Sequence, residues 1–124
     1  MLVFSNRRLG PAAEVLVSLE VASAMLRATA EAAKAAAEGR WEHELVQWLV
    51  ERSARSERGS LDVGDIAWSP DNFERQRRFL LEAIDRATSG SHHARPLGRW
   101  AAMIEAHPRD SVQVGRRWVL QATV

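Results

Sequence analysis

The chain has 124 residues, of which 46% are apolar and 27% are charged, and its formal net charge is +1. This length and composition predict a single globular domain over residues 1–124, built around one core, and they exclude extensive disorder. A charge so close to zero argues against nucleic acid as a partner, because nucleic-acid binders usually carry a concentrated basic surface.

The lack of cysteine and of long apolar stretches narrows the class of protein further. Without cysteine the chain has no disulfide, no zinc–thiolate site and no thiol nucleophile. No segment approaches the ~18 consecutive apolar residues of a membrane helix, and the first residues lack the order of a secretory signal. We therefore expect no membrane association and a cytoplasmic location. Every basic residue except Lys34 is arginine, which is typical of a GC-rich bacterial genome, although selection for bidentate ion pairs would give the same bias.

The N-terminal third predicts two strands and a helix. The apolar run from Leu2 to Phe4 predicts a short edge strand. Residues 15–21 fit both a period of two and a helical period. A single helix over 12–38 would be ~40 Å long at 1.5 Å per residue, which is too long for a domain of this size. We therefore favour a strand over 15–21 and a helix over 22–38.

A second helix is expected over 41–52, and its apolar surface is unusually wide. Val46 and Val50 extend the apolar arc to ~200°, whereas a surface helix typically has a stripe a little over 100° wide. Two explanations stay open. The helix is central and buried on two sides, which we favour, or the edge formed by Val46 and Val50 meets another chain. These two valines are therefore candidate interface residues.

The third helix has the clearest pattern and runs from Pro70 to Thr88, after a short strand over 61–68. Ser69 is its expected N-cap, and Ser89-Gly90 is expected to end it. Three acid–base pairs at i,i+4 spacing are expected to be solvated on its outer face: Asp71/Arg75, Glu74/Arg78 and Glu82/Arg86.

A fourth helix is expected over 97–106, because Pro108 prevents it from continuing much further. The alternating apolar residues of 111–123 predict a final strand or hairpin. Taken together, these elements predict an α+β fold in which three to four helices pack on a small, mostly antiparallel sheet.

Arg77 departs from the pattern of the third helix, because it projects into the apolar stripe formed by Phe73, Leu80 and Ile84. An arginine at such a position must extend past the core to solvent or find an acidic partner. Asp62 and Asp65 are the nearest acids upstream, and Trp68 could stack on the guanidinium. Asp62, Asp65, Trp68 and Arg77 are therefore our candidate binding residues.

Phe79 departs in the opposite direction, since it lies about 120° from the apolar stripe on a helical wheel. Beside Arg75 and Arg86 it has the composition of a protein interface, in which aromatic residues and arginine are enriched. Phe79, Arg75 and Arg86 are therefore further interface candidates. The alternative, which we favour for Phe79 itself, is contact with another part of the same chain.

The sequence contains no motif that specifies a catalytic or metal-binding chemistry. Adjacent His92 and His93 match no metal-site spacing and predict an exposed loop, whereas His107 is expected to cap its helix or to lie in the core. Asp62-x-x-Asp65 is half of a carboxylate site that nothing else completes, and Asp is also a common turn residue. We find no phosphate-binding loop, nucleophile elbow or nucleophile–base spacing. No catalytic residue, metal or cofactor is therefore predicted.

Three hypotheses about function follow. The leading hypothesis is a small bacterial protein-interaction module, such as an adaptor, an immunity-type protein or a self-associating homo-oligomer, without catalytic activity. The second is a small-molecule or phosphoester-binding protein, or an enzyme, with its pocket near Asp62, Asp65, Trp68 and Arg77. The third, which the charge disfavours, is nucleic-acid binding through Arg75, Arg78 and Arg86.

Overall fold

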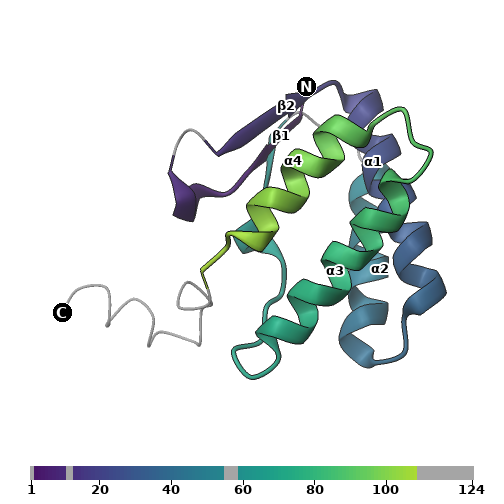
Figure 1. Ribbon diagram of the computed structural model, residues 1–124, viewed down its shortest axis with the longest axis vertical. Helices are drawn as coiled ribbons and strands as arrows, with labels where there is room; N and C mark the ends of the chain where they lie inside the picture. Colours follow the sequence, from purple (N-terminus) through teal and green to yellow (C-terminus); the bar gives the residue numbers. More distant parts are fainter. Residues whose placement is uncertain (1, 11–12, 55–58, 109–124) are drawn as a thin grey trace.

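The protein is described by a computed structural model for residues 2–10, 13–54 and 59–108. The predicted α+β class is confirmed, because four helices pack beside a three-stranded sheet (Figure 1). The strands are β1 (Leu2–Ser5), β2 (Glu14–Val17) and β3 (Gly59–Asp62). The helices are α1 (Leu19–Ala36), α2 (Arg40–Ala54), α3 (Phe73–Thr88) and α4 (Ala94–Glu105). The predicted strand or hairpin over 111–123 lies outside the described residues.

Strand β1 is the central strand of the sheet, so the prediction of an edge strand over Leu2–Phe4 was wrong. The strand order is β2-β1-β3. β1 pairs antiparallel with β2 and parallel with β3, and the sheet is therefore mixed. Phe4 lies between Val15 and Leu61 in this register, and all three side chains face the core. Sequence reasoning missed the central position because β3 comes from a distant part of the chain.

The boundary between β2 and α1 is set by Ser18. Its Oγ accepts a hydrogen bond from the backbone N–H of Val21 at 3.1 Å, which is the bond expected of an N-cap. The helix therefore starts at Leu19, and the predicted strand over 15–21 ends at Val17. Within the strand, alternation holds as predicted, because Val15 and Val17 are buried while Leu16 between them is 60% exposed.

Helix α4 packs on β1 and β2, α3 packs on α4, and α1 packs on both α3 and α2. Figure 1 shows α4 as the helix beside the sheet. Helix α1 is the central helix because small buried residues, among them Ala22, Ala30 and Ala33, allow both α2 and α3 to pack closely against it. This arrangement overturns the expectation that α2 is the central helix. α2 packs mainly on α1 and leaves Val50 46% exposed.

Helix α3 starts three residues later than predicted and ends as predicted. Pro70 to Asn72 form a turn closed by a hydrogen bond from Asn72 N–H to the Ser69 carbonyl, 3.1 Å long. Ser69 does not act as the N-cap. Instead, its backbone N–H donates to the Gln76 side-chain oxygen at 2.8 Å. Gly90 follows the helix with φ of +71°, a conformation that glycine adopts readily and that commonly ends helices.

The segment between β3 and α3 also differs from its prediction. The strand expected over 61–68 ends at Asp62, and residues Val63–Asp65 form a single turn of 3₁₀-helix. Helix α4 starts three residues before its predicted start at 97. Among the described helices, none is long and apolar enough to cross a membrane.

Candidate functional site

Asp62 is a structural anchor between β1 and β3. Its side chain is only 5% exposed and accepts three hydrogen bonds: from Ser5 Oγ at 3.0 Å, from Arg7 N–H at 2.9 Å and from Gly64 N–H at 2.8 Å. The Arg7 guanidinium lies 3.4 Å away. Burial by itself raises the pKa of this carboxyl, but these hydrogen bonds and the Arg7 charge outweigh burial and lower the pKa below its ordinary value. The hydrogen-bond acceptors of the Asp62 carboxylate are thus used within the protein itself.

Asp65 belongs to the same turn but remains accessible. One carboxylate oxygen accepts a hydrogen bond from Asp62 N–H at 3.4 Å, and the other lies 3.9 Å from the Arg7 guanidinium. Its side chain is 57% exposed. Of the two predicted aspartates, only Asp65 can therefore contact a ligand without breaking buried hydrogen bonds.

His107 lies in the core, as one of its two predicted roles required, and is 1% exposed. Its Nδ1 is 3.3 Å from the Asn6 side-chain oxygen, while the Asn6 amide group donates to the Met103 carbonyl at 2.9 Å. The His107 ring stacks on Trp68 with ring centroids 5.8 Å apart. Asn6 and His107 thus join the end of β1 to the end of α4. Asn6 is a polar residue that sequence reasoning did not single out.

The free energy of unfolding is expected to fall as the pH falls from about 6.5, the ordinary pKa of histidine, toward the lower pKa of folded His107. Burial is the largest cause of the lowered pKa; Asp62 opposes it, and Arg8 and Arg77 add to it. In this window the unfolded chain binds a proton that the folded protein does not. Urea denaturation between pH 7.5 and 5 measures the slope, which His107→Gln should reduce and His92→Gln, in an exposed loop, should leave unchanged.

Arg77 finds an acidic partner, but the predicted partners were wrong. Its guanidinium donates to both oxygens of the Glu74 carboxylate at 2.8 and 2.7 Å and to the backbone carbonyls of Glu105 at 2.9 Å and His107 at 3.2 Å. It also lies over the Phe73 ring, 5.0 Å from the centroid, rather than on Trp68. Arg77 therefore binds carbonyl groups at the C-terminal end of α4, where a positive charge is favourable.

Arg77→Ala is expected to lower the free energy of unfolding by about 1.5–3 kcal/mol, the range for hydrogen bonds to a charged group. Arg77→Lys should recover only part of the loss, because an ammonium group lacks the planar fork that reaches a carboxylate and two carbonyls together. Arg78→Ala, at an exposed neighbour, should change the value by less than ~0.5 kcal/mol. Equal effects of the alanine variants at 77 and 78 in chemical denaturation would contradict this role.

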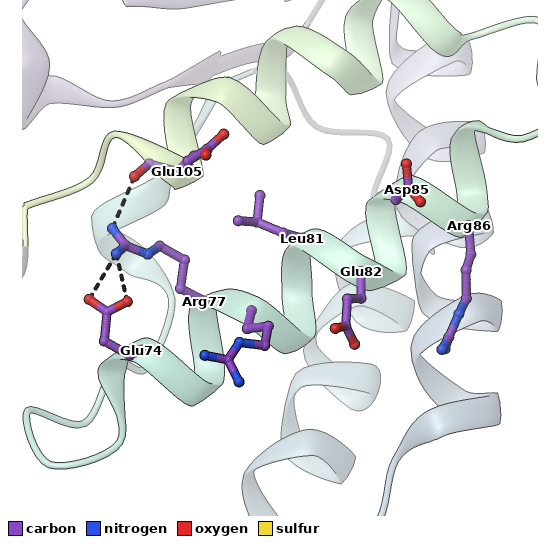
Figure 2. A pocket seen from close by; sticks show the side chains of 8 residues that line it. Glu74, Arg77, Leu81, Glu82, Asp85, Arg86 and Glu105 are labelled. Atoms are coloured by element: carbon purple, nitrogen blue, oxygen red, sulfur yellow. Dashed lines mark hydrogen bonds and ion pairs between the residues drawn. The ribbon is translucent and has the colours of Figure 1, made fainter.

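Arg77 also borders a groove of about 550 Å³ between α3 and α4 (Figure 2). Leu81 points into the groove, and Asp85 and Arg86 lie at its far end. Its lining contains three arginines and four acidic residues, so positive and negative charges nearly balance. Within the described residues none of the three predicted i,i+4 pairs of α3 forms an ion pair, and Glu74 pairs with Arg77 instead of Arg78. This groove offers no concentrated charge for a phosphate or a nucleic acid.

Five rings form an aromatic cluster at the end of the molecule where α3 begins. Trp41 stacks on Trp68 and meets Phe79 edge-on, with ring centroids 6.2 Å apart in both pairs. Trp68 in turn contacts Phe73 at 5.0 Å and His107 at 5.8 Å. The expectation that Phe79 contacts another part of its own chain is thereby confirmed. Phe79, Trp41 and Trp68 nonetheless remain partly exposed.

Two small cavities are both bordered by Trp41. The first, about 170 Å³, brings together the predicted interface residues Phe79 and Arg75. The second, about 210 Å³, is bordered by Trp48 and by the predicted binding residue Asp65. We call the two cavities and their rims the Trp41 surface; its residues are Trp41, Glu42, Glu44, Leu45, Trp48, Asp65, Ile66, Ala67, Asn72, Arg75, Gln76 and Phe79.

Trp41 is the residue that sequence reasoning missed. Its indole N–H donates to the Ala67 carbonyl at 2.6 Å, and the Trp68 N–H donates to the Val63 carbonyl at 3.0 Å, so both rings are fixed in place. The sequence carried one signal, since Trp41 and Trp48 are seven residues apart and lie on the same side of α2. The partner rings come from other elements and were not predictable from that spacing.

Two further interface candidates, Val46 and Val50, occupy a different surface. Val46 and Val50 line a groove of about 390 Å³ between α1 and α2, together with alanines and with Glu31 and Lys34 on its rim. The candidate interface residues therefore divide among this groove, the α3–α4 groove, which contains Arg86, and the Trp41 surface, instead of forming one site.

No protein-family model, curated protein or solved structure matches this chain. Within the described ranges, no group of three or more His, Asp or Glu side chains is placed to hold a metal ion. The geometry of the Trp41 surface is therefore the observation from which a function can be argued.

Proposed function

We propose that the protein is a small, non-catalytic interaction module that binds a partner protein through the Trp41 surface. The observation that carries the proposal is the partial exposure of Trp41, Trp48 and Phe79 around two cavities at one end of the molecule, where Trp68 stacks on Trp41. The sequence-based expectation of a bacterial, cytoplasmic protein belongs to the same proposal.

The chemistry of this surface supports protein binding. Tryptophan and arginine are the residues on which binding energy in protein interfaces most often concentrates, and tryptophan loses little conformational entropy when it is buried. The rings of Trp41 and Trp68 are already fixed by hydrogen bonds to backbone carbonyls, so a partner would meet a preorganised surface. Polar side chains, among them Glu42, Glu44 and Arg75, surround the rings as they do at the rim of an interface.

The size of the cavities also favours a protein over a small ligand. Cavities of about 170 and 210 Å³ each accommodate one side chain. Pockets for small molecules usually measure ~300–1,000 Å³. A pair of side-chain-sized cavities that share one bordering ring fits two neighbouring anchor residues of a polypeptide.

The hypothesis of a phosphoester pocket at Asp62, Asp65, Trp68 and Arg77 stays a prediction, and no specific observation favours it. The Asp62 carboxylate already accepts three hydrogen bonds from groups of the protein itself. The Arg77 guanidinium is bound by Glu74 and by backbone carbonyls.

Site-specific photo-crosslinking tests the proposed function. A photoreactive phenylalanine analogue would replace Trp48, and in a matched variant Leu16, which is 60% exposed on β2 and distant in the chain. A partner trapped at position 48 would then be purified and its dissociation constant measured directly. Trp48→Ala and Phe79→Ala should each weaken binding at least ~10-fold, whereas Leu16→Ala should change it less than ~2-fold.

The same experiment also detects self-association. If the trapped partner is a second copy, sedimentation equilibrium should show a dimer that Trp48→Ala dissociates, and the partner of the module is then the protein itself. A partner that crosslinks equally from positions 16 and 48, or whose affinity is unchanged by Trp48→Ala and Phe79→Ala, would refute the proposed function.

A further inference from the structure

We propose that the cavity between Trp41 and Trp48 receives a cationic side chain, arginine or lysine, of the partner protein. This inference rests on the proposed function and adds to it the chemistry of the residue that is recognised. The cavity combines aromatic rings with two carboxylates, those of Glu44 and Asp65. Cations bind over aromatic rings, with tryptophan the strongest, and an adjacent carboxylate adds a charge-assisted hydrogen bond.

The two carboxylates are available to a partner. The side chains of Glu44 and Asp65 are 58% and 57% exposed. The indole N–H of Trp48 makes no hydrogen bond within the described part of the chain, in contrast to those of Trp41 and Trp68. Leu45 and Ile66 complete an apolar floor against which the aliphatic part of a long cationic side chain can pack.

In the unbound protein both carboxylates already attract guanidinium groups. Glu44 accepts a hydrogen bond from Arg40 at 3.0 Å, and Asp65 lies 3.9 Å from Arg7. The Arg40 side chain is 93% exposed and that of Arg7 is 72% exposed. Exposed ion pairs contribute little free energy, so a partner's cation held also by the rings can replace these arginines.

The neighbouring cavity is not suited to a cation. It is bordered by Arg75 as well as by Glu42, and the arginine would repel a positive side chain. The two halves of the Trp41 surface therefore differ in charge. The charged side chains of the half that contains Trp48 are all acidic, whereas the other half has one acidic and one basic side chain. This asymmetry would fix the direction in which a partner segment binds.

The experiment is an NMR titration of the ¹⁵N-labelled full chain with N-acetyl-arginine amide, N-acetyl-lysine amide and the neutral N-acetyl-norleucine amide. The indole N–H signal of Trp48, assigned by its loss in Trp48→Phe, is followed at constant ionic strength. We expect saturable shifts with the arginine and lysine amides, with dissociation constants of about 1–30 mM. The norleucine amide should bind at least ~10-fold more weakly because it lacks the charge.

Two charge variants make the test specific to Glu44. Glu44→Gln should weaken binding of the arginine amide about 3- to 10-fold, since it removes one carboxylate. Arg40→Gln should strengthen binding about 2- to 5-fold, since it removes the internal competitor. Glu51→Gln, at an exposed position of α2 outside the Trp41 surface, changes net charge as Glu44→Gln does and should have less than a ~2-fold effect.

The outcomes separate this inference from the proposed function. Equal shifts with the norleucine amide, no shift with any of the amides, or equal effects of Glu44→Gln and Glu51→Gln would overturn the cation site. A crosslinked partner whose affinity depends on Trp48 but not on Glu44 would also overturn it while leaving the interaction module intact. Saturable arginine binding without any partner at position 48 would support the cation site and refute the module.

Discussion

Asp62→Ala is expected to lower the free energy of unfolding by about 3–5 kcal/mol. The substitution removes one buried carboxylate and leaves three donors without an acceptor: the Ser5 hydroxyl and the N–H groups of Arg7 and Gly64. Each unsatisfied buried donor costs about 1–3 kcal/mol, and water entering the gap would recover part of that cost. Urea denaturation followed by circular dichroism measures the change.

Asp65→Ala is the matched control, because Asp65 lies in the same turn and accepts only a 3.4 Å hydrogen bond from Asp62 N–H. We expect a loss of less than ~1 kcal/mol. Asp62→Asn should fall between the two, since it keeps one acceptor oxygen and introduces an amide donor that faces other donors. If the alanine variants at 62 and 65 are equally stable, Asp62 does not anchor β3 to β1.

Trp100→Ala is expected to cause a comparable loss, about 3–5 kcal/mol, the usual range for truncating a buried aromatic side chain. Trp100 is fully buried on α4 and contacts the Phe4 ring edge-on, with centroids 5.1 Å apart. The substitution would open a cavity between α4 and the central strand. Thermal unfolding by calorimetry, with chemical denaturation at one temperature, measures the loss.

Trp100→Phe separates the packing of this ring from its polar atom. Within the described residues, the indole N–H of Trp100 is the one buried side-chain N or O atom without a hydrogen-bond partner. Phenylalanine removes that donor while keeping a ring against Phe4, so part of the packing loss is offset by relief of an unsatisfied group. We expect a loss of less than ~2 kcal/mol, and a value equal to that of Trp100→Ala would show that the indole packing is irreplaceable.

The features that could be predicted from the sequence were those that depend on residues close to one another along the chain. The amphipathic pattern of α3 identified its buried stripe, since Phe73, Leu80 and Ile84 are all about 1% exposed or less. The departure of Arg77 from that pattern was also visible. Its partners were not, because the Glu105 and His107 carbonyls depend on how α4 packs against α3. Sequence spacing cannot show which carbonyls end beside a given guanidinium.

The candidate site was only partly predictable for the same reason. Phe79, Arg75 and Asp65 were identified individually, and all three lie on the Trp41 surface. What unites them is Trp41, which reaches the Ala67 carbonyl across the segment between β3 and α3. That contact is non-local. Asp62 shows the converse, because a carboxylate that resembles a ligand-binding group in sequence accepts hydrogen bonds from the Ser5 hydroxyl of β1 and from the N–H groups of Arg7 and Gly64.

The central position of β1 has a consequence for synthesis of the protein on the ribosome. β1 cannot complete its pairing until β3 has been synthesised, and Asp62 follows Ser5 by 57 residues. At a synthesis rate of ~5–20 residues per second, about 3–12 s pass between the synthesis of β1 and that of β3, and one edge of β1 is unpaired during this time. During that interval β2 is the strand of the described sheet with which it can pair. β1 is therefore made well before it can complete its native hydrogen bonding with β3.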